Sequence, residues 1–426
     1  MTATPARALV VGLGRSAVAL ARFLRGRGQP VTVCDSRPAA ELEEHIANLP
    51  PGVTRILGGY DESVLESIDA VFASPGVAWD APLLDSARRR GLSVSSEIDL
   101  FFQLCPASIV GITGTNGKTT TTALTAEVLA RGPRPVLVGG NIGETVLDRL
   151  DELTPEHWVV LELSSFQLES ITNPRVAIGV VLNITPDHLD RHGTLARYVD
   201  AKARLVEYLE PTDTAVLNGA DPAVRALAGR TRGRVVWFEE HEPLPEMPLP
   251  GRHNLQNAKA AAAVGRLAGL DDDSIAAAVA GFKGVEHRLE LVGEWGGVRW
   301  YNDTKATNPD AAVVGLEAFE EGSLVLIAGG YGSGFVLTEW LAAIRRRAAA
   351  VVLIGASAGE LEQALASHPG LRRAGSIAEA VDIAFRLAEP GGIVLLSPGY
   401  KSYDMFKSFE DRGRQFKAAV LARNAG

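Results

Sequence analysis

The sequence has few of the features that mark secreted, membrane-spanning or nucleic-acid-binding proteins. It contains only two cysteines, Cys34 and Cys105, which lie far apart and lack the spacing of zinc ligands. A disulfide framework is therefore excluded. No apolar run approaches the roughly 18 residues that span a membrane, and residues 1–7 lack the pattern of a signal peptide. The formal net charge of -9 argues against a nucleic-acid partner, because such binding relies on neutralised phosphates.

The rest of the composition is ordinary for a globular protein. Apolar residues make up 46% of the chain and charged residues 22%. A chain of 426 residues predicts about three domains at roughly 150 residues each. We therefore expect a cytoplasmic monomer that acts on small molecules and has neither a membrane nor a nucleic acid as partner.

Residues 111–120, with the sequence Gly-Ile-Thr-Gly-Thr-Asn-Gly-Lys-Thr-Thr, form the most informative stretch. An apolar run precedes them and a helical pattern follows, so the glycines lie on a strand-to-helix turn. Such a turn directs backbone N–H groups and a helix N-terminus at a phosphate. Counted from Gly111, the spacing is one residue too long for the strict phosphate-loop motif, and the match runs through Gly114 and Gly117. A glycine-rich turn without a function is the alternative.

Several residues of the central region are candidates for holding phosphates or Mg²⁺. Lys118 can reach the β- and γ-phosphates, and the Thr119 hydroxyl can ligate Mg²⁺. Glu162 lies near the end of an apolar strand, where a carboxylate needs a cation unless it is a satisfied structural acid. His188 follows the next strand and is either a metal ligand or a packed loop residue. Lys202 lies on a helix, and a solvated face is its alternative.

The N-terminal region predicts a second nucleotide site. A strand at residues 8–11 leads into a G-x-G-x-x-A turn that contains Gly14, and a second strand ends in Asp35, where dinucleotide folds place a ribose-binding acid. Ser74 follows another strand, at the edge where ligands bind in such sheets. The motif alone leaves three alternatives, namely NAD(P), a substrate linked to a diphosphate, or no ligand.

The last third of the chain again alternates buried-type strands with helices. Functional loops are expected after three of the strands, at residues 303–307, 329–334 and 397–402. Arg288 lies at the junction and could swing onto phosphates. Just before it in sequence, Asn254 and Asn257 share one face of a long helix and could hold a base or ribose, although Asn254 could instead cap the helix.

These motifs resemble those of the Mur ligase family, and the resemblance covers nearly the whole length. The matching segments are residues 113–120, 162–169, 183–193, 253–257, 287–288 and 302–308. The phosphate loop is also similar to that of folylpolyglutamate synthetases. The segment Ser-Ser-Phe-Gln-Leu-Glu at residues 164–169 and the N-terminal G-x-G region narrow the resemblance to Mur ligases that use D-glutamate.

The resemblance implies an α/β fold of three domains. A Rossmann-like domain that binds the UDP substrate is expected at residues 1–104. A central P-loop ATPase-type domain with a parallel sheet is expected at residues 105–284. A C-terminal Rossmann-like domain that contacts the amino acid and ATP is expected at residues 285–426.

The resemblance also implies an ADP-forming amide ligase of peptidoglycan precursor synthesis that uses ATP and Mg²⁺. ATP would phosphorylate the alanyl carboxylate of UDP-N-acetylmuramoyl-L-alanine, and the amine of D-glutamate would attack the acyl phosphate. Three alternatives stay open, namely another Mur-type or folylpolyglutamate-type ligase, a nicotinamide-dependent dehydrogenase, and a pure binding protein.

By the same resemblance, matching positions have expected roles. The expected ATP contacts are Gly114, Thr115, Asn116, Gly117, Lys118, Thr119, Thr120, Asn257, Arg288 and Asp303. Mg²⁺ would be held by Thr119, Glu162, His188 and a carbamylated Lys202, and Lys118 joins the last three as a catalytic group. The UDP substrate would contact Gly14, Asp35, Ser36, Arg37 and Ser74, with Asn141, Ser164 and Gln167 at the acceptor site.

The D-glutamate site is where the sequence departs from the family. Lys305, Thr307, Ser402 and Phe409 would lie around the amino acid. Residues 329–334, however, lack the acid and the lysine that relatives usually carry after the glycine pair. Because a dicarboxylate needs positive charge or several donors, we expect Lys401 to supply the missing cation, with a solvated Lys401 as the alternative.

Overall fold

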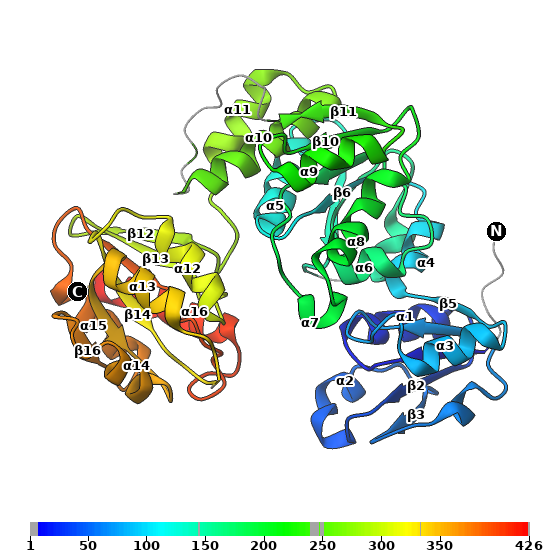
Figure 1. Ribbon diagram of the computed structural model, residues 1–426, viewed down its shortest axis with the longest axis horizontal. Helices are drawn as coiled ribbons and strands as arrows, with labels where there is room; N and C mark the ends of the chain where they lie inside the picture. Colours follow the sequence, from blue (N-terminus) through cyan, green and yellow to red (C-terminus); the bar gives the residue numbers. More distant parts are fainter. Residues whose placement is uncertain (1–6, 144, 239–246, 248–250, 333, 425–426) are drawn as a thin grey trace. The chain divides into compact units, whose positions relative to one another are not determined.

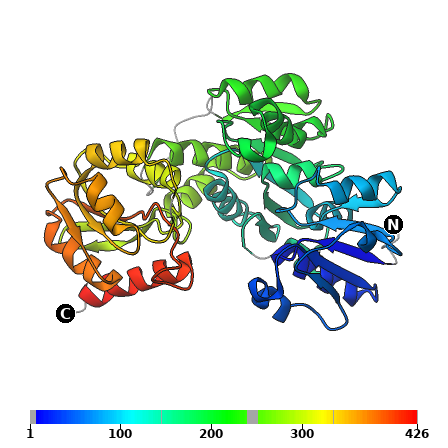
Figure 2. The ribbon, with the colours of Figure 1, turned by 60° about the horizontal axis from the view of Figure 1, so that its bottom comes forward.

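The computed structural model describes residues 7–143, 145–238, 247, 251–332 and 334–424. Three separate sheets, each flanked by helices, follow one another along the chain (Figures 1 and 2). This arrangement confirms the predicted α/β class. Cys34 and Cys105 are both free thiols, in keeping with the absence of a disulfide framework.

The first sheet is parallel throughout and has the strand order β3-β2-β1-β4-β5. Its strands are β1 (Ala8–Val11), β2 (Val31–Asp35), β3 (Thr54–Leu57), β4 (Ala70–Ala73) and β5 (Ser93–Ser95). The helices are α1 (Arg15–Gly26), α2 (Glu43–Ala47), α3 (Pro82–Arg89) and α4 (Glu97–Leu104), with short 3₁₀ turns at Ala39–Glu41 and Glu62–Leu65. The loops after β1, β2 and β4 therefore meet at one edge.

The second sheet is also parallel, in the order β11-β10-β9-β6-β8-β7. Its strands are β6 (Ser108–Thr113), β7 (Val136–Gly140), β8 (Trp158–Glu162), β9 (Ile178–Val181), β10 (Thr214–Leu217) and β11 (Arg234–Trp237). Its helices are α5 (Lys118–Leu129), α6 (Ser165–Ser170), α7 (Leu189–His192), α8 (Leu195–Glu207), α9 (Pro222–Ala226), α10 (Arg252–Leu267) and α11 (Asp272–Gly281), with 3₁₀ turns at Val146–Glu152 and Leu227–Arg230. Because β6 lies between β8 and β9, the phosphate loop lies beside the ends of both neighbours.

The third sheet has the order β12-β13-β17-β14-β15-β16 and is parallel except for its antiparallel edge strand β12. Its strands are β12 (Glu290–Trp295), β13 (Val298–Asn302), β14 (Leu324–Ala328), β15 (Ala348–Leu353), β16 (Leu371–Arg373) and β17 (Ile393–Leu396). Its helices are α12 (Pro309–Glu317), α13 (Thr338–Arg347), α14 (Ala358–Ala364), α15 (Ile377–Leu387) and α16 (Phe409–Asn424).

Alternation along the strands builds a core on each face of a sheet. In β1, Val10 packs with α1 and α4, whereas its neighbour Leu9 packs with α3 on the opposite face. The third sheet behaves in the same way: Leu326 packs with α12, α13 and α14, and Ile327 packs with α15 and α16. Near-continuous apolar strands are therefore buried on both faces, as the sequence predicts.

The chain divides into two compact units, Met1–Leu244 with Gln256–Ala278, and Pro245–Leu255 with Val279–Gly426. Within the first unit, one hydrophobic cluster runs from the β1 face through Phe101 and Leu147 to α8 of the second sheet. Among the described helices, none combines the length and the apolar character needed to cross a membrane.

Some elements were not expected from the sequence. The edge strands β5, β12 and β16 are short or half exposed, and a weak apolar pattern gives them little signal. The helix α10 begins at Arg252, so Asn254 lies inside its first turn and the prediction that it could cap the helix is wrong. Asn254 and Asn257 are both buried.

Candidate active site

The phosphate loop, residues 114–117, leaves β6 and enters α5 at Lys118. Gly117 has φ +83°, a left-handed conformation that favours glycine, and it caps the N-terminus of α5. A Cβ atom at Gly117 would lie 2.4 Å from Oδ1 of Asn257, so any larger residue would collide with α10. The loop is therefore fixed as a concave stretch of backbone that ends at a helix N-terminus.

Two ammonium groups converge on one carbonyl of this loop. The Nζ atom of Lys118 donates to the carbonyl oxygens of Gly114, at 2.9 Å, and Thr115, at 2.8 Å. The Nζ atom of Lys202, from α8, donates to the same Gly114 oxygen at 2.8 Å. Lys202 is 1% exposed, and burial, followed by the nearby Lys118, holds its pKa well below the usual lysine value, although Asp187 and Glu162 oppose this. An anion bound at the loop would meet both amines.

Glu162 lies at the end of β8, and only one of its two carboxylate oxygens has a hydrogen-bond partner among the described residues. Its Oε1 accepts a hydrogen bond from Nδ2 of Asn141 at 2.8 Å, whereas its Oε2 is buried and has no partner among the described residues. A buried carboxylate oxygen without a donor is costly. Mg²⁺ prefers such oxygens, so the donor set at this strand end fits that ion.

The segment after β9 brings His188 near the same edge. Asn183 exchanges two hydrogen bonds with Asn116 of the phosphate loop, at 2.8 and 3.0 Å, which ties this segment to the loop. His188 has φ +51° and a half-exposed side chain, and its backbone N–H donates to Asp187 at 2.8 Å. The ring lies 5.0 Å from that of Phe166, measured between centroids. A half-exposed imidazole at this place can bind a metal ion or another ligand.

A cavity of about 490 Å³ lies where the first sheet meets the second. The residues that line it include, from the expected substrate set, Gly14, Asp35, Ser36, Arg37, Ser74, Asn141 and Gln167, together with Tyr60. Residues more than 100 positions apart in sequence thus line the same cavity. Its size suits a ligand with several rings or phosphates.

Asp35 is more heavily bonded than a ribose acceptor should be. Its carboxylate accepts from the backbone N–H of Leu13 at 2.7 Å and of Arg37 at 2.9 Å, and from the Arg37 guanidinium at 3.0 and 2.7 Å. Although burial opposes ionisation, the hydrogen bonds from Arg37 and Leu13 lower the pKa of Asp35 to about 2. The carboxylate therefore holds Arg37, which has a half-exposed side chain and is one of the residues that line the cavity.

Ser164 and Gln167 form a capping box at the start of α6. The Gln167 N–H donates to Oγ of Ser164 at 3.2 Å, and the Ser164 N–H donates to Oε1 of Gln167 at 3.1 Å. Gln167 also lines the cavity. These two side chains therefore start the helix, and of the two only Gln167 is among the residues that line the cavity.

In the second unit, Arg288 and Asp303 come close together. Asp303 is buried, accepts from Oγ of Ser397 at 2.8 Å, and accepts from the N–H of Leu289 at 3.3 Å. Burial raises the pKa of Asp303 to about 7, although Ser397 and Arg288 oppose the shift. The Nε atom of Arg288 is buried and has no hydrogen-bond partner among the described residues, so it can still donate to a ligand.

Changing Asp303 to asparagine should stabilise the protein at pH 8 but not at pH 5. The folded-state pKa lies above the unfolded value, so the folded form holds a proton between about pH 4 and pH 7 and loses stability as the pH rises through that window. An amide does not ionise, so the variant avoids this loss. Its gain in the free energy of unfolding is therefore expected to be larger at pH 8 than at pH 5 by on the order of 2 kcal/mol. Thermal unfolding at both pH values measures it, with the exposed Asp310→Asn as control. Equal melting shifts at the two pH values would contradict the assignment.

The residues expected at the D-glutamate site lie on the loop after β13, on the loop after β17 and at the start of α16. Ser402 is buried, while Lys401 is exposed and pairs through its backbone with Tyr331 at 2.8 and 3.1 Å. Thr307 follows Lys305, whose ammonium lies 5.9 Å from the centre of the Phe409 ring. Ser333, in the glycine-rich loop, lies outside the described residues.

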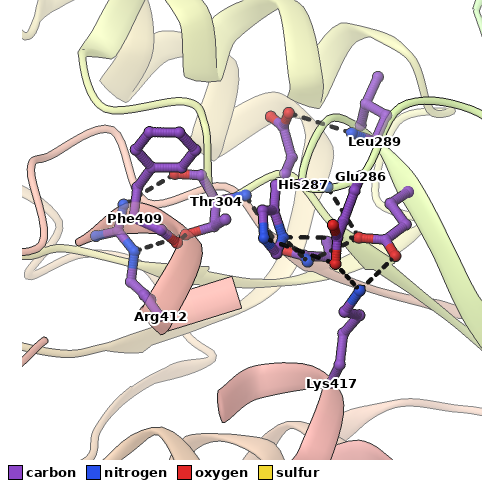
Figure 3. A network of polar contacts seen from close by, with 10 residues as sticks. Glu286, His287, Leu289, Thr304, Phe409, Arg412 and Lys417 are labelled. Carbon is purple, nitrogen blue, oxygen red and sulfur yellow. Dashed lines mark hydrogen bonds and ion pairs between the residues drawn. The ribbon is translucent and has the colours of Figure 1, made fainter. Parts of the chain in front are cut away.

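Arg412, on α16, is fully buried and was not singled out from the sequence. Its guanidinium donates to Oγ1 of Thr304 at 2.8 Å and to the Thr304 carbonyl at 3.0 Å (Figure 3). It also donates to the Tyr400 carbonyl at 3.1 Å. Burial lowers the pKa of Arg412 to about 10. It joins the loop after β13 to the loop after β17. Arginine on an amphipathic helix is usually solvated, so no sequence signal marks this role.

Comparisons with known proteins agree with this architecture. Three domain families match along the chain: Mur ligase MurD-like N-terminal domain at residues 6–96, Mur ligase middle domain at 112–244, and Mur ligase glutamate ligase domain at 287–399. Among solved structures, the UDP-N-acetylmuramate-alanine ligase MurC from Thermotoga maritima aligns with a TM-score of 0.61 at 20% identity, over 99% of this chain and 100% of its own. The fold and these domains define an ATP-dependent ligase.

Relatives that match over the full length narrow the family to one kind of ligase. The UDP-N-acetylmuramoylalanine--D-glutamate ligase of Pelotomaculum thermopropionicum is 42% identical over 454 residues, covering 99% of each chain. The enzyme of the same name from Desulfitobacterium hafniense is 42% identical over 97% of each chain. The chain therefore belongs to the Mur ligase family, in the branch of the UDP-N-acetylmuramoylalanine--D-glutamate ligases.

Proposed function

We propose that the protein joins D-glutamate to UDP-N-acetylmuramoyl-L-alanine and cleaves ATP to ADP and phosphate in peptidoglycan precursor synthesis. The observation that carries the proposal is the convergence of Lys118 and Lys202 on the Gly114 carbonyl of the phosphate loop, which creates a site for a polyanion. The full-length relatives bear the name of this reaction.

In the first step, a carboxylate oxygen of the alanyl group attacks the γ-phosphorus of ATP. A carbon-bound oxygen gains a bond to phosphorus, the bond from the γ-phosphorus to the bridging oxygen breaks, and ADP leaves. The Lys118 ammonium and the backbone N–H groups of residues 114–119 stabilise the charge that develops on the phosphoryl oxygens. Asn257, Arg288 and Asp303 are the remaining proposed ATP contacts.

We propose Mg²⁺ as the metal, held by Thr119, Glu162, His188 and a carbamylated Lys202. The buried Oε2 of Glu162 lacks a partner in the described part of the chain, which supports a cation at this position. Mg²⁺ bound there supplies charge neutralisation on the transferring phosphate. Carbamylation would convert the Lys202 amine into an anionic group able to help bind the ion.

In the second step, the amine of D-glutamate attacks the acyl carbon. A C–N bond forms, the C–O bond to the phosphoryl group breaks, phosphate leaves and the amine gives up its proton to solvent. Lys305, Thr307, Ser402 and Phe409 are the proposed contacts of the amino acid. Lys401 is the proposed cation for one of its carboxylates, helped by backbone N–H groups of the neighbouring glycine-rich loop.

The UDP-linked substrate is proposed to occupy the cavity between the first two sheets, against Gly14, Asp35, Ser36, Arg37 and Ser74. Asn141, Ser164 and Gln167 are proposed to face its alanyl end. A nicotinamide cofactor is disfavoured at this place, because the Asp35 carboxylate is already engaged by Arg37 and Leu13 and would act on a bound ligand through Arg37, not as the acceptor of a ribose hydroxyl.

The further proposals concern the domain boundaries, the oligomeric state and the cellular location of the protein. The proposed domain boundaries are residues 1–104, 105–284 and 285–426. We propose that the protein acts as a monomer in the cytoplasm, where it needs no partner other than its small-molecule substrates.

The function is tested by phosphate release with ATP, Mg²⁺ and UDP-N-acetylmuramoyl-L-alanine. Release should begin only when D-glutamate is added, because the amine must consume the acyl phosphate. L-glutamate, L-lysine and a folate with L-glutamate serve as parallel acceptors. Stimulation by any of these in place of D-glutamate would assign the protein to another ligase.

A further inference from the structure

The turn that carries Arg288, residues 285–290, is held in a strained conformation. His287 has φ +68° and Leu289 has φ +43°, so two residues other than glycine flank Arg288 in the left-handed region. The left-handed conformation is unfavourable for any residue that carries a Cβ atom. A turn of this kind persists only when surrounding contacts hold it.

Hydrogen bonds hold this turn from several sides. The His287 N–H donates to Oε2 of Glu290 at 2.9 Å, and Nδ2 of Asn302 reaches the same oxygen at 3.0 Å. The backbone of Lys305 donates to the His287 carbonyl at 3.1 Å. Glu290 is therefore the side chain that fixes the first strained residue, and its own position decides that of the turn.

Lys417, on α16, fixes Glu290 in turn. Its Nζ atom donates to Oε1 of Glu290 at 2.8 Å and to Oε1 of Glu286 at 2.5 Å (Figure 3). Burial opposes the charge on Lys417, but the hydrogen bonds to the two carboxylates outweigh it and raise its pKa. The ammonium thus lies between two acids that would otherwise repel each other.

The helix α16 can hold the turn because a glycine lets it approach. A Cβ atom at Gly413 would lie 2.4 Å from Nδ1 of His287 and 2.7 Å from the side chain of Thr304. One turn of helix further on, Lys417 lies on the same face of α16 and reaches the two glutamates. The helix therefore supports the turn at two points.

We propose that Lys417 is a positioning residue for ATP, whose ammonium bonds Glu286 and Glu290, two members of a cluster that also contains His287, and thereby sets the turn that aims Arg288. The inference rests on the proposed contact of Arg288 with ATP. The ligand atoms of the cluster all lie within 4.8 Å of one another, a spacing that also suits one divalent cation. Lys417 supplies the positive charge that a metal ion would supply in such a cluster.

The kinetic test is Lys417→Met, which keeps the length of the side chain and removes its charge. The two carboxylates then repel each other, Glu290 releases the His287 N–H, and Arg288 loses its fixed direction. The KM for ATP should rise about fivefold or more, while the KM values for D-glutamate and for the UDP substrate change by less than about twofold. Lys417→Arg should stay near the parent.

The matched control is Arg423→Met, which removes another ion pair of α16, that with Asp382, away from the turn. It should leave all three KM values unchanged. If Lys417→Met proves too unstable, Glu286→Gln removes the negative charge of one partner of Lys417 and should give a smaller rise in the KM for ATP alone. An unchanged KM for ATP, or equal rises for all three substrates, would overturn the proposal.

The second readout does not need turnover. Calorimetric titration with Zn²⁺, without nucleotide, should show one more binding site per chain in Lys417→Met than in the parent, because the metal can replace the lost ammonium. The double variant Lys417→Met with Glu286→Gln should lose that site. Absence of the added site would refute the cluster, whereas a parent that binds as expected but shows no D-glutamate-dependent phosphate release would refute the proposed function instead.

Discussion

Replacing Lys118 with methionine is expected to lower kcat for phosphate release about a thousandfold. The ammonium of Lys118 lies on the first turn of α5 and donates to two carbonyl oxygens of the phosphate loop. On ATP binding, it can exchange those carbonyls for β- and γ-phosphate oxygens. Methionine fills the same space without a charge, so the negative charge that grows in the transition state loses its nearest fixed partner.

A matched control separates this effect from a loss of folding. Lys283→Met removes an exposed lysine from a loop and should leave kcat and the melting temperature unchanged. Lys118→Arg should remain impaired, since a planar guanidinium does not replace the compact ammonium under a narrow loop. A Lys118→Met enzyme that keeps more than a tenth of the parent kcat would show that the phosphates bind elsewhere.

The sequence predicts those parts of the site whose residues are neighbours in the chain. The phosphate loop could be recognised because its glycines, its lysine and its flanking strand and helix all lie within residues 108–129. Glu162 could be singled out because a carboxylate in an apolar strand is expensive without a partner. In the structure, the buried Oε2 of Glu162 has no hydrogen-bond partner among the residues described, which agrees with that argument.

Contacts between distant segments could not be predicted in the same way. Lys417 and Glu286 are 131 residues apart, and on its helix Lys417 looks like any other solvated lysine. Asp35 was expected to face a ribose, but nothing in the local sequence tells how its carboxylate is shared between Arg37 and Leu13. Such polar contacts depend on tertiary distances, which periodicity does not encode.

The Lys202→Ala variant should lose activity about a hundredfold or more. Lys202 is 1% exposed, and its ammonium contacts the Gly114 carbonyl and the Tyr198 ring, neither of which carries a negative charge. A buried, unpaired cation is expensive, and the proposed Mg²⁺ nearby would repel it. A carbamate on the same nitrogen turns this unfavourable charge into an anion that the metal attracts.

Two measurements decide whether Lys202 acts as a carbamate. Enzyme equilibrated with ¹³C-labelled bicarbonate should give a carbamate carbon signal that the Lys202→Ala variant lacks, and Lys259→Ala, on the half-exposed side of α10, should retain it. Addition of formate or acetate should restore part of the activity of Lys202→Ala, because a small carboxylate fits the space left by the side chain and supplies the missing negative charge. Full activity of the alanine variant without any added anion would show that Lys202 only supports the Gly114 carbonyl, and the metal would then have to be held by Thr119, Glu162 and His188 alone.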